Sequence, residues 1–479
     1  MVTRRWLSSV ASAKSSGKGL VVPVAEVHRF IVDCLKAVGT CTDKACVQAD
    51  VLVAADYRGH FSHGMNRLEM YVKDVKNGTC MPNAEPCVLN DTPSTAWVDG
   101  NNGLGAIVGN FCTHMSIQKA KQTGIGWVTA KCSNHYGIAA FYAEQALQEG
   151  MLGMTFTNTS PLMTPTHAKQ AALGTNPLSL AAPGTGGDSI IIDMATTAVA
   201  VGKIEFQRRK KAPIPSGWAL GPDGAPTTDA EVAFKTGLLM PLGGSETHSG
   251  YKGYCLGILV EVFSGILSGS AYGPNIRHWL RPTDKPADIG HSFVAINPNC
   301  FAPDFGCRMQ DLITYLRNLK PQDPSKPVLV PGDPERKNMK LVDKQGGIQY
   351  HENQLKASLN DILQQWKFLS IAKTLCKRRR EREEIKQEKM HYFHVSVWNF
   401  RPSAKLSGRH HYQNFCDFVI FSVFILVRSA SVTSNDVAFL RLTMKDNRNE
   451  QSQYMEPMLP DQYSPHSSSP IKHCYIGSA

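Results

Sequence analysis

Residues 125–157 read IGWVTAKCSNHYGIAAFYAEQALQEGMLGMTFT, and this stretch decides the fold class. Its first six residues form an apolar run that predicts a buried strand. The turn Ser133-Asn134-His135-Tyr136-Gly137 separates that run from residues 138–149, which predict a helix. Residues 151–157 predict a second strand, and residues 190–194 a third. Alternation of strands and helices is typical of an α/β fold.

The region before this stretch is predicted to be helical. Residues 24–36 carry apolar side chains at helical spacing, and residues 42–57 begin with Thr42-Asp43, which is typical of a helix N-terminus. A turn at residues 58–64 precedes a third helix, which runs to about Lys76 and ends at Asn77-Gly78. On the far side of the α/β stretch, residues 256–268 are apolar nearly all round and predict a core helix.

These patterns divide the chain into five parts. We expect a transit peptide or disordered N-terminus at 1–20, a helical region at 21–95, an α/β core at 96–270, a segment that returns to the core at 271–365, and an atypical, disordered tail at 366–479. The first eighteen residues contain arginine, lysine and serine but no acid, as mitochondrial transit peptides do. A cytoplasmic and a mitochondrial matrix location therefore both stay open.

Composition excludes several classes of partner. Much of the formal charge of +11 belongs to residues 367–479, which hold 17 Lys/Arg against 10 Asp/Glu. The basic run at 377–382 has no interleaved aromatic residues, so no nucleic-acid partner is predicted. The apolar block at 418–427 is half the roughly twenty residues that a membrane helix needs. Thirteen scattered cysteines without a CxxC pair predict reduced thiols and no metal site.

Ser62-His63-Gly64 and Arg67 carry the strongest chemical signal. An imidazole exchanges protons near neutral pH, and a guanidinium binds a carboxylate through two hydrogen bonds. If the segment is helical, residues 63 and 67 share one face. Such a pair suits the interconversion of a 2-oxo acid and a 2-hydroxy acid. A His-x₃-Arg pair on a solvated helix face is the competing interpretation.

Cofactor signals are weaker. A G-x-G-x-x-G fingerprint is missing from the sequence, so a Rossmann domain is not supported. His135-Tyr136-Gly137 stands where a strand leads into a helix, a place that attracts anions or holds a capping residue. The glycine-rich residues 243–253 include Lys252, which suits either a phosphate contact or a flexible loop. The basic run at 208–211 is interpreted as a solvated loop.

Taken in order, these strings resemble the type-2 malate/L-lactate dehydrogenase family over residues 20–365. The matching strings are Asp56-x-Arg58-Gly59-x-x-Ser62-His63-Gly64-x-x-Arg67, Ser133-Asn134-His135-Tyr136-Gly137, Thr157-Asn158-Thr159-Ser160-Pro161, Leu173-Gly174-Thr175-Asn176-Pro177, Asp193-Met194-Ala195-Thr196, Pro213-Ile214-Pro215-x-Gly217-Trp218-Ala219-Leu220, Gly250-Tyr251-Lys252-Gly253 and Val330-Pro331-Gly332-Asp333-Pro334.

The resemblance implies a non-Rossmann fold with a mixed central sheet that binds NAD or NADP through residues 96–270. It implies a homodimer whose active sites lie near the subunit interface. By this analogy His63 donates the proton, Ser62 assists it, and Arg67, with Thr175, binds the substrate. The cofactor would contact His135, Tyr136, Gly137, Thr175, Asp193, Met194, Ala195, Thr196, Tyr251, Lys252, Gly332 and Asp333.

The resemblance does not choose the substrate. Malate/oxaloacetate comes first and lactate/pyruvate second; a 2-oxo acid of the diketogulonate, sulfopyruvate or ureidoglycolate type and a catalytically silent member are the alternatives. Members that reduce cyclic imino acids carry an acid where this chain has Lys203, which argues against that activity. Arg67 accounts for one carboxylate of malate, and the sequence does not identify a cation for the other.

Overall fold

The computed structural model describes residues 14–15, 19–278, 285–351 and 354–355 of the 479. Most of the predicted N-terminal segment and the whole predicted tail at 366–479, with its basic run and apolar block, lie outside the described residues. Among the described residues, no helix is long and apolar enough to cross a membrane. Their ten cysteines form no disulfide with one another, and none of these residues form a cluster suited to a metal ion.

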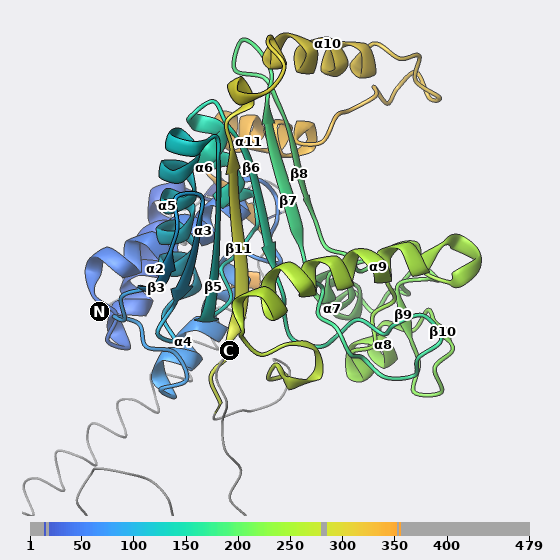
Figure 1. Ribbon diagram of the computed structural model, residues 1–479. Coiled ribbons are helices and arrows are strands. Elements are labelled where there is room, and N and C mark those ends of the chain that lie inside the picture. The colour runs from blue at the N-terminus through green and yellow to red at the C-terminus, as the bar shows by residue number, and fades with distance from the viewer. Residues whose placement is uncertain (1–13, 16–18, 279–284, 352–353, 356–479) are drawn as a thin grey trace, which may run out of the picture. The chain divides into compact units, whose positions relative to one another are not determined.

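A mixed sheet of seven strands forms the centre of the fold (Figure 1). Across the sheet the strands run β3 (Cys87–Asp91), β4 (Thr95–Asp99), β5 (Ile125–Ser133), β11 (Ile289–Ile296), β6 (Leu152–Thr157), β7 (Leu178–Pro183) and β8 (Ser189–Met194). Only β4 and β5 pair in parallel; the other neighbours in this sheet are antiparallel. The predicted α/β class and mixed sheet are confirmed, and β5, β6 and β8 match the three predicted strands.

Helices cover both faces of this sheet. On one face lie α5 (Gly105–Thr123) and α6 (Ala140–Gln148); on the other lies α9 (Gly250–Glu261), which continues as a π-helix over Val262–Ile266 (Figure 1). Strand β11 touches both layers because its side chains alternate. Phe293 packs with residues of α5 and α6, whereas Val294 packs with Val260 and Phe263.

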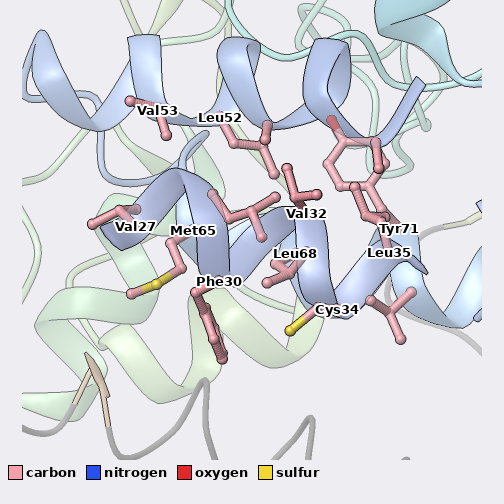
Figure 2. Packing of buried hydrophobic residues seen from close by; sticks show 14 of the residues in the cluster. Val27, Phe30, Val32, Cys34, Leu35, Leu52, Val53, Met65, Leu68 and Tyr71 are labelled. Atoms are coloured by element: carbon pink, nitrogen blue, oxygen red, sulfur yellow. The ribbon is translucent and has the colours of Figure 1, made fainter. Parts of the chain in front are cut away.

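The predicted helical N-terminal region is present as α2 (Val24–Ala37), α3 (Thr42–Tyr57) and α4 (Leu68–Lys76), with a 3₁₀ turn at Met65–Arg67 before α4. Figure 2 shows how their apolar side chains interlock: Phe30 and Leu35 come from α2, Leu52 from α3 and Leu68 from α4. A small sheet of β1 (Lys14–Ser15), β2 (Leu20–Val22) and β12 (Ile348–Tyr350) adjoins this cluster. The end of the described chain thus packs beside its beginning.

The sequence predicted that residues 256–268 form a helix buried on all sides. This prediction is wrong, because one face of the helix is exposed. The buried positions of this segment are Gly257, Val260, Glu261, Ser264, Gly265 and Ser268, most of them small. The large apolar side chains point outward, and each is at least 40% exposed: Ile258, Leu259, Val262, Ile266 and Leu267. The helix also begins earlier, because Gly250 to Gly253 form its first turn rather than a loop.

The remaining elements stand around the ends of the sheet. Two short strands, β9 (Ala219–Leu220) and β10 (Pro226–Thr227), lie with helices α7 (Val201–Arg209) and α8 (Ala230–Thr236) (Figure 1). Helix α10 (Phe305–Arg317) contacts β7 and β8, and α11 (Asp333–Gln345) contacts α3. Short 3₁₀ turns occupy Glu246–His248, Gly273–Asn275 and Pro298–Cys300.

Candidate active site

Residues 61–67 bring Ser62, His63 and Arg67 together without a shared helix face. The prediction that residues 63 and 67 lie on one helix is wrong, because 61–64 form a turn and α4 begins only at Leu68. The Ser62 hydroxyl lies 2.9 Å from His63 Nδ1, and Arg67 Nε donates to the Ser62 carbonyl at 2.7 Å. No other described residue accepts a hydrogen bond from Arg67, so its terminal nitrogens are available to a carboxylate.

The buried carboxyl group of Asp56 is hydrogen-bonded to the end of this turn. Asp56, on α3, accepts hydrogen bonds at Oδ2 from the Met65 backbone N–H (2.9 Å) and from the Tyr350 hydroxyl (2.6 Å). A Cβ added to Gly64 would lie 1.9 Å from Asp56 Oδ1, so only glycine fits here. Asp56 is fully buried, and burial raises its pKa to about 7 against the weaker opposing effect of those two hydrogen bonds.

The imidazole of His63 packs against a second imidazole, that of His135. The rings of His63 and His135 stack with their centroids 5.8 Å apart. The Tyr71 hydroxyl lies 2.5 Å from His135 Nδ1, and the Gly137 backbone N–H donates to the same nitrogen at 3.2 Å. Because Nδ1 accepts these bonds, His135 carries its proton on Nε2 in the neutral state.

Both imidazoles are neutral at pH 7. Burial, with a smaller effect of the nearby Arg67 charge, lowers the pKa of His63 to about 3. The pKa of His135 is also lowered well below its usual value, first by burial and then by His63 and Arg67. A neutral His63 is suited to accept a proton from a hydroxyl group. A carboxylate bound at Arg67 would offset the repulsion from that guanidinium and favour the protonated form.

A cavity of about 340 Å³ opens beside Ser62 and Arg67. His60 and Phe61 also line it, and helix α7 forms another part of the wall with Lys203, Glu205 and Arg209, followed by Lys210. Helix α7 comes close because a Cβ on Gly202 would lie 2.8 Å from Ser62 Cβ and 3.6 Å from an Arg67 terminal nitrogen. The lining therefore holds four cations and one carboxylate, Glu205, which pairs with Arg209.

Several of the predicted cofactor residues come together at the end of β8. The Thr196 backbone N–H and hydroxyl both donate to the Thr175 carbonyl, at 2.9 and 3.1 Å. Asp193 accepts from the backbone N–H of Ala140, three residues after Gly137, at 2.8 Å. Burial raises the pKa of Asp193 to about 6. Met194 and Ala195 complete this segment, so the loops after β5 and β8 are neighbours.

Other predicted cofactor residues stand apart from that group. Tyr136 is fully buried, with its ring stacked between Tyr142 (4.7 Å) and His291 (4.6 Å). Tyr251 and Lys252 lie exposed in the first turn of α9, where no described side-chain contact joins them to Thr175. Their cofactor roles stay predictions.

Gly332 and Asp333 begin helix α11 beside the other end of β8. The Ile191 backbone N–H donates to the Pro331 carbonyl at 3.0 Å, and Gly332 adopts a φ of +99°. Asp333 pairs with Arg317 and Arg336, and its hydrogen bond from Arg317 lowers its pKa strongly. The oxygens of Asp333 are occupied by these arginines, which hold this loop in place. The cofactor contacts of Gly332 and Asp333 stay predictions.

Several site residues were not identified from the sequence. Tyr71, Tyr350 and His60 lie far along the chain from their partners or outside any recognisable pattern. The basic run at 208–211, interpreted as a solvated loop, places Arg209 and Lys210 on the cavity wall, although both are exposed. For Arg209 and Lys210 the basic run itself was the only signal in the sequence.

The chain is similar to dehydrogenases of one family. A family model described as malate/L-lactate dehydrogenase matches residues 22–358. The chain is 41% identical to a malate dehydrogenase of Pyrococcus abyssi over 300 residues, 62% of this chain and 82% of that protein. It is 36% identical to an L-sulfolactate dehydrogenase of Methanocaldococcus jannaschii over 340 residues, 70% of this chain and 95% of that protein.

Solved structures show the same fold. The malate dehydrogenase of Pyrococcus horikoshii OT3 superposes with a TM-score of 0.66 at 35% identity, covering 74% of this chain and 97% of the other. With the family model matched over well more than half of its length, the chain belongs to the malate/L-lactate dehydrogenase family.

Proposed function

We propose that this dehydrogenase interconverts a dianionic 2-hydroxy acid and its 2-oxo acid, with malate and oxaloacetate as the first choice and NAD or NADP as cofactor. One observation carries the choice: the cavity beside Ser62 places the Arg67 guanidinium opposite a helix that supplies three further cations. The family assignment supports the 2-hydroxy acid chemistry, and the charge of the cavity supports the dianion.

Charge and space in the cavity fit such a substrate. The free terminal nitrogens of Arg67 suit the carboxylate next to the reacting carbon. Lys203, Arg209 and Lys210 lie along α7 and just beyond its end, and Glu205 neutralises Arg209. Lys203 and Lys210 therefore remain for a second anionic group, the cation that Arg67 alone did not provide. A monoanion such as pyruvate would leave that positive wall unneutralised.

The residues of the turn divide the proton chemistry between them. Arg67 holds the substrate so that its C2 oxygen lies near the Ser62 and His63 pair. In oxidation His63 accepts the hydroxyl proton; in reduction it returns one, with Ser62 hydrogen-bonded to its ring. Positioning by Arg67 and proton transfer by His63 together lower the barrier. A nicotinamide cofactor, when bound, supplies or accepts the hydride at C2.

The predicted cofactor residues fit a nucleotide in part. Within the described part of the chain the Thr175 hydroxyl has one hydrogen-bond partner, Thr159 Oγ1 at 3.3 Å, so it retains capacity for a ribose or phosphate oxygen. The Nε2–H of His135 is a neutral donor beside His63. By contrast, one oxygen of Asp193 and both oxygens of Asp333 already accept protein hydrogen bonds. These residues do not distinguish NAD from NADP.

The alternative substrates differ in charge. Sulfopyruvate is also a dianion and suits the same wall, in keeping with the similarity to an L-sulfolactate dehydrogenase. Pyruvate, diketogulonate and ureidoglycolate type acids carry one carboxylate and use only Arg67. A catalytically silent protein would not need the free Arg67 nitrogens beside Ser62 and His63.

The direct test measures initial rates of cofactor oxidation and reduction by fluorescence. Wild-type protein is assayed with oxaloacetate, sulfopyruvate and pyruvate against NADH and NADPH, beside His63→Ala. We expect turnover with a dianionic acid and its loss in His63→Ala. Turnover with pyruvate at equal or higher kcat/KM would refute the dianion assignment, and no turnover with any pair by folded protein would refute the function.

Charge variants locate the second anion site. Lys203→Met and Lys210→Met remove one cavity cation each, and Lys211→Met is the matched control because Lys211 is exposed but does not line the cavity. We expect each cavity variant to lower kcat/KM for oxaloacetate about 3- to 5-fold while leaving pyruvate nearly unchanged, a modest effect because both side chains contact solvent. Equal losses for both substrates, or the same loss in Lys211→Met, would contradict the role of α7.

The predicted homodimer is supported by the outward face of α9. Five large apolar side chains on α9 and the π-helical turn that continues it are at least 40% exposed, a density typical of an interface rather than of a solvated helix. Helix α9 follows directly on the loop that contacts Thr196, whose carbonyl accepts from the Leu242 N–H at 2.9 Å. A second copy packed on this face would cover a helix whose buried side lies against Thr196, where a Cβ on Gly257 would come 3.3 Å from Oγ1.

A further inference from the structure

His291 lies in the middle of the sheet, on the central strand β11, and has no part in the proposed chemistry. Its side chain is fully buried. Its Nε2 lies 2.8 Å from the Ser133 hydroxyl and 3.1 Å from the Asn134 carbonyl, and its Nδ1 lies 2.7 Å from the Thr157 hydroxyl. Ser133 ends β5 and Thr157 ends β6, so one imidazole joins the ends of both neighbouring strands.

The hydrogen-bond pattern fixes the state of this imidazole. A carbonyl oxygen only accepts, so Nε2 carries the proton and donates it toward Asn134. Nδ1 is then the acceptor that faces the Thr157 hydroxyl, which also lies within hydrogen-bond distance of the Asn158 carbonyl at 2.9 Å. Burial lowers the pKa of His291 to about 3, so this neutral tautomer persists across the working pH range. The Tyr136 ring stacks on the imidazole at 4.6 Å with planes 2° apart, which prevents rotation.

Asn134 passes this restraint to the active site. Its carbonyl accepts from His291, its Oδ1 accepts the His135 backbone N–H at 2.7 Å, and its Nδ2 donates to Asp74 at 3.0 Å. The peptide that carries His135 is therefore held on both sides. The His135 ring in turn receives the Tyr71 hydroxyl and stacks with His63.

We propose that His291 is a positioning residue: through the Asn134 carbonyl and the Ser133 hydroxyl it sets the place of the His135 ring beside His63. His291 touches no substrate, and its effect reaches the reaction through two peptide bonds. This proposal rests on the proposed function only where turnover is the readout. Displacement of a reacting or orienting group by about 1 Å costs on the order of 100-fold in rate, so the effect is measurable.

His291→Phe tests the proposal because a phenyl ring keeps the stacking on Tyr136 and loses all three polar contacts, to Ser133, Asn134 and Thr157. Phe293→Leu is the matched control: Phe293 lies two residues along β11, packs in the same ring cluster with centroids 6.0 Å from His291, and forms no side-chain hydrogen bond. His291→Gln places an amide group, which can donate a hydrogen bond, close to the position of Nε2. His291→Asn places the amide group close to the position of Nδ1 instead. Melting temperature, kcat and KM for oxaloacetate and NADH are measured for all four.

We expect His291→Phe to lower kcat about 10- to 100-fold with little change in KM, while Phe293→Leu loses similar thermal stability but keeps kcat within about 3-fold. His291→Gln should recover more kcat than His291→Asn, a comparison that remains decisive if His291→Phe does not fold. Equal kcat losses in His291→Phe and Phe293→Leu, or an unchanged kcat in His291→Phe, would overturn the proposal.

A readout without turnover separates this proposal from the proposed function. In protein labelled with ¹⁵N-histidine, the His135 ring signals are assigned from their loss in His135→Gln. We expect these signals to shift in His291→Phe and to stay in place in Phe293→Leu. If they do not move in His291→Phe, the positioning role is wrong, whether or not the wild-type protein turns over any 2-oxo acid.

Discussion

Asp56→Asn should make the protein's stability less dependent on pH. Asp56 is fully buried under the active-site turn, where Oδ2 accepts two hydrogen bonds and Oδ1 has no described partner. Burial raises its pKa from 3.8 to about 7, so the folded protein binds this proton more tightly than the unfolded chain does. The folded state therefore loses stability as pH rises from about 4 to about 7, and the loss levels off above that range.

The magnitude follows from the size of the shift. About three pKa units at roughly 1.4 kcal/mol each give about 4 kcal/mol, the cost of keeping an ionised Asp56 at pH 8 relative to the neutral carboxyl at pH 4. Asparagine keeps an oxygen for the Met65 N–H and the Tyr350 hydroxyl and has no proton to lose. From pH 4 to pH 8, the unfolding free energy of Asp56→Asn should therefore fall by about 4 kcal/mol less than that of the wild-type protein.

Urea unfolding at pH 4 and at pH 8 measures this difference. Asp311→Asn, an exposed aspartate on α10, serves as the control and should parallel wild type at both pH values. The titration of Asp193 is common to all three proteins and cancels. If the unfolding free energies of Asp56→Asn and wild type change by the same amount between the two pH values, Asp56 is ionised in the folded protein and the reasoning fails.

Three further perturbations test other parts of the structure. Because the pKa of His63 is lowered to about 3, kcat/KM for malate oxidation should not change near pH 6.5, where a free imidazole would titrate. The kcat/KM for oxaloacetate reduction should instead rise as pH falls, because His63 must then be protonated. Identical pH profiles in both directions would count against His63. Gly137→Ala should cost about 1–3 kcal/mol of unfolding free energy, because its Cβ would lie 2.2 Å from Val51 Cγ1 at a φ of +86°. Gly150→Ala, at a φ of +72° with open space around it, measures the cost of backbone strain alone. Val51→Ala should recover only the part of the Gly137→Ala loss that comes from the side-chain clash. Leu267→Glu, on the exposed face of α9, should convert a dimer to monomers in light-scattering chromatography, and a wild-type monomer would refute the dimer itself.

The sequence predicted those elements whose pattern is local. The helices at 24–36 and 42–57 and the strands at 125–130, 151–157 and 190–194 all appear in the structure within a few residues. Strand β11 was missed because its sequence, IGHSFVAI, places Gly290, His291 and Ser292 in a buried strand. These residues break the apolar run that normally reveals such a strand, since their side chains satisfy contacts far along the chain.

The candidate site shows the same division. The proximity of Ser62, His63 and Arg67 could be predicted, because a few residues of chain connect them, although the local geometry is a turn and not a helix. The proximity of α7 could not, because it depends on Gly202 packing against Ser62 from about 140 residues away. The raised pKa of Asp56 likewise could not be predicted, because it arises from burial in the folded protein and outweighs the opposing hydrogen bond from Tyr350, near the end of the described chain.

The place of β11 has a consequence for synthesis. Strands β5 and β6 follow one another along the chain, yet in the sheet β11 lies between them, paired to both. During synthesis, the edges of β5 and β6 that pair with β11 remain unpaired until a segment more than 130 residues downstream has been made, as the contact between Thr157 and His291 shows. At about 5–20 residues per second that interval is several seconds to nearly half a minute. Shielding of the two edges in the nascent chain is therefore a condition for reaching the native sheet.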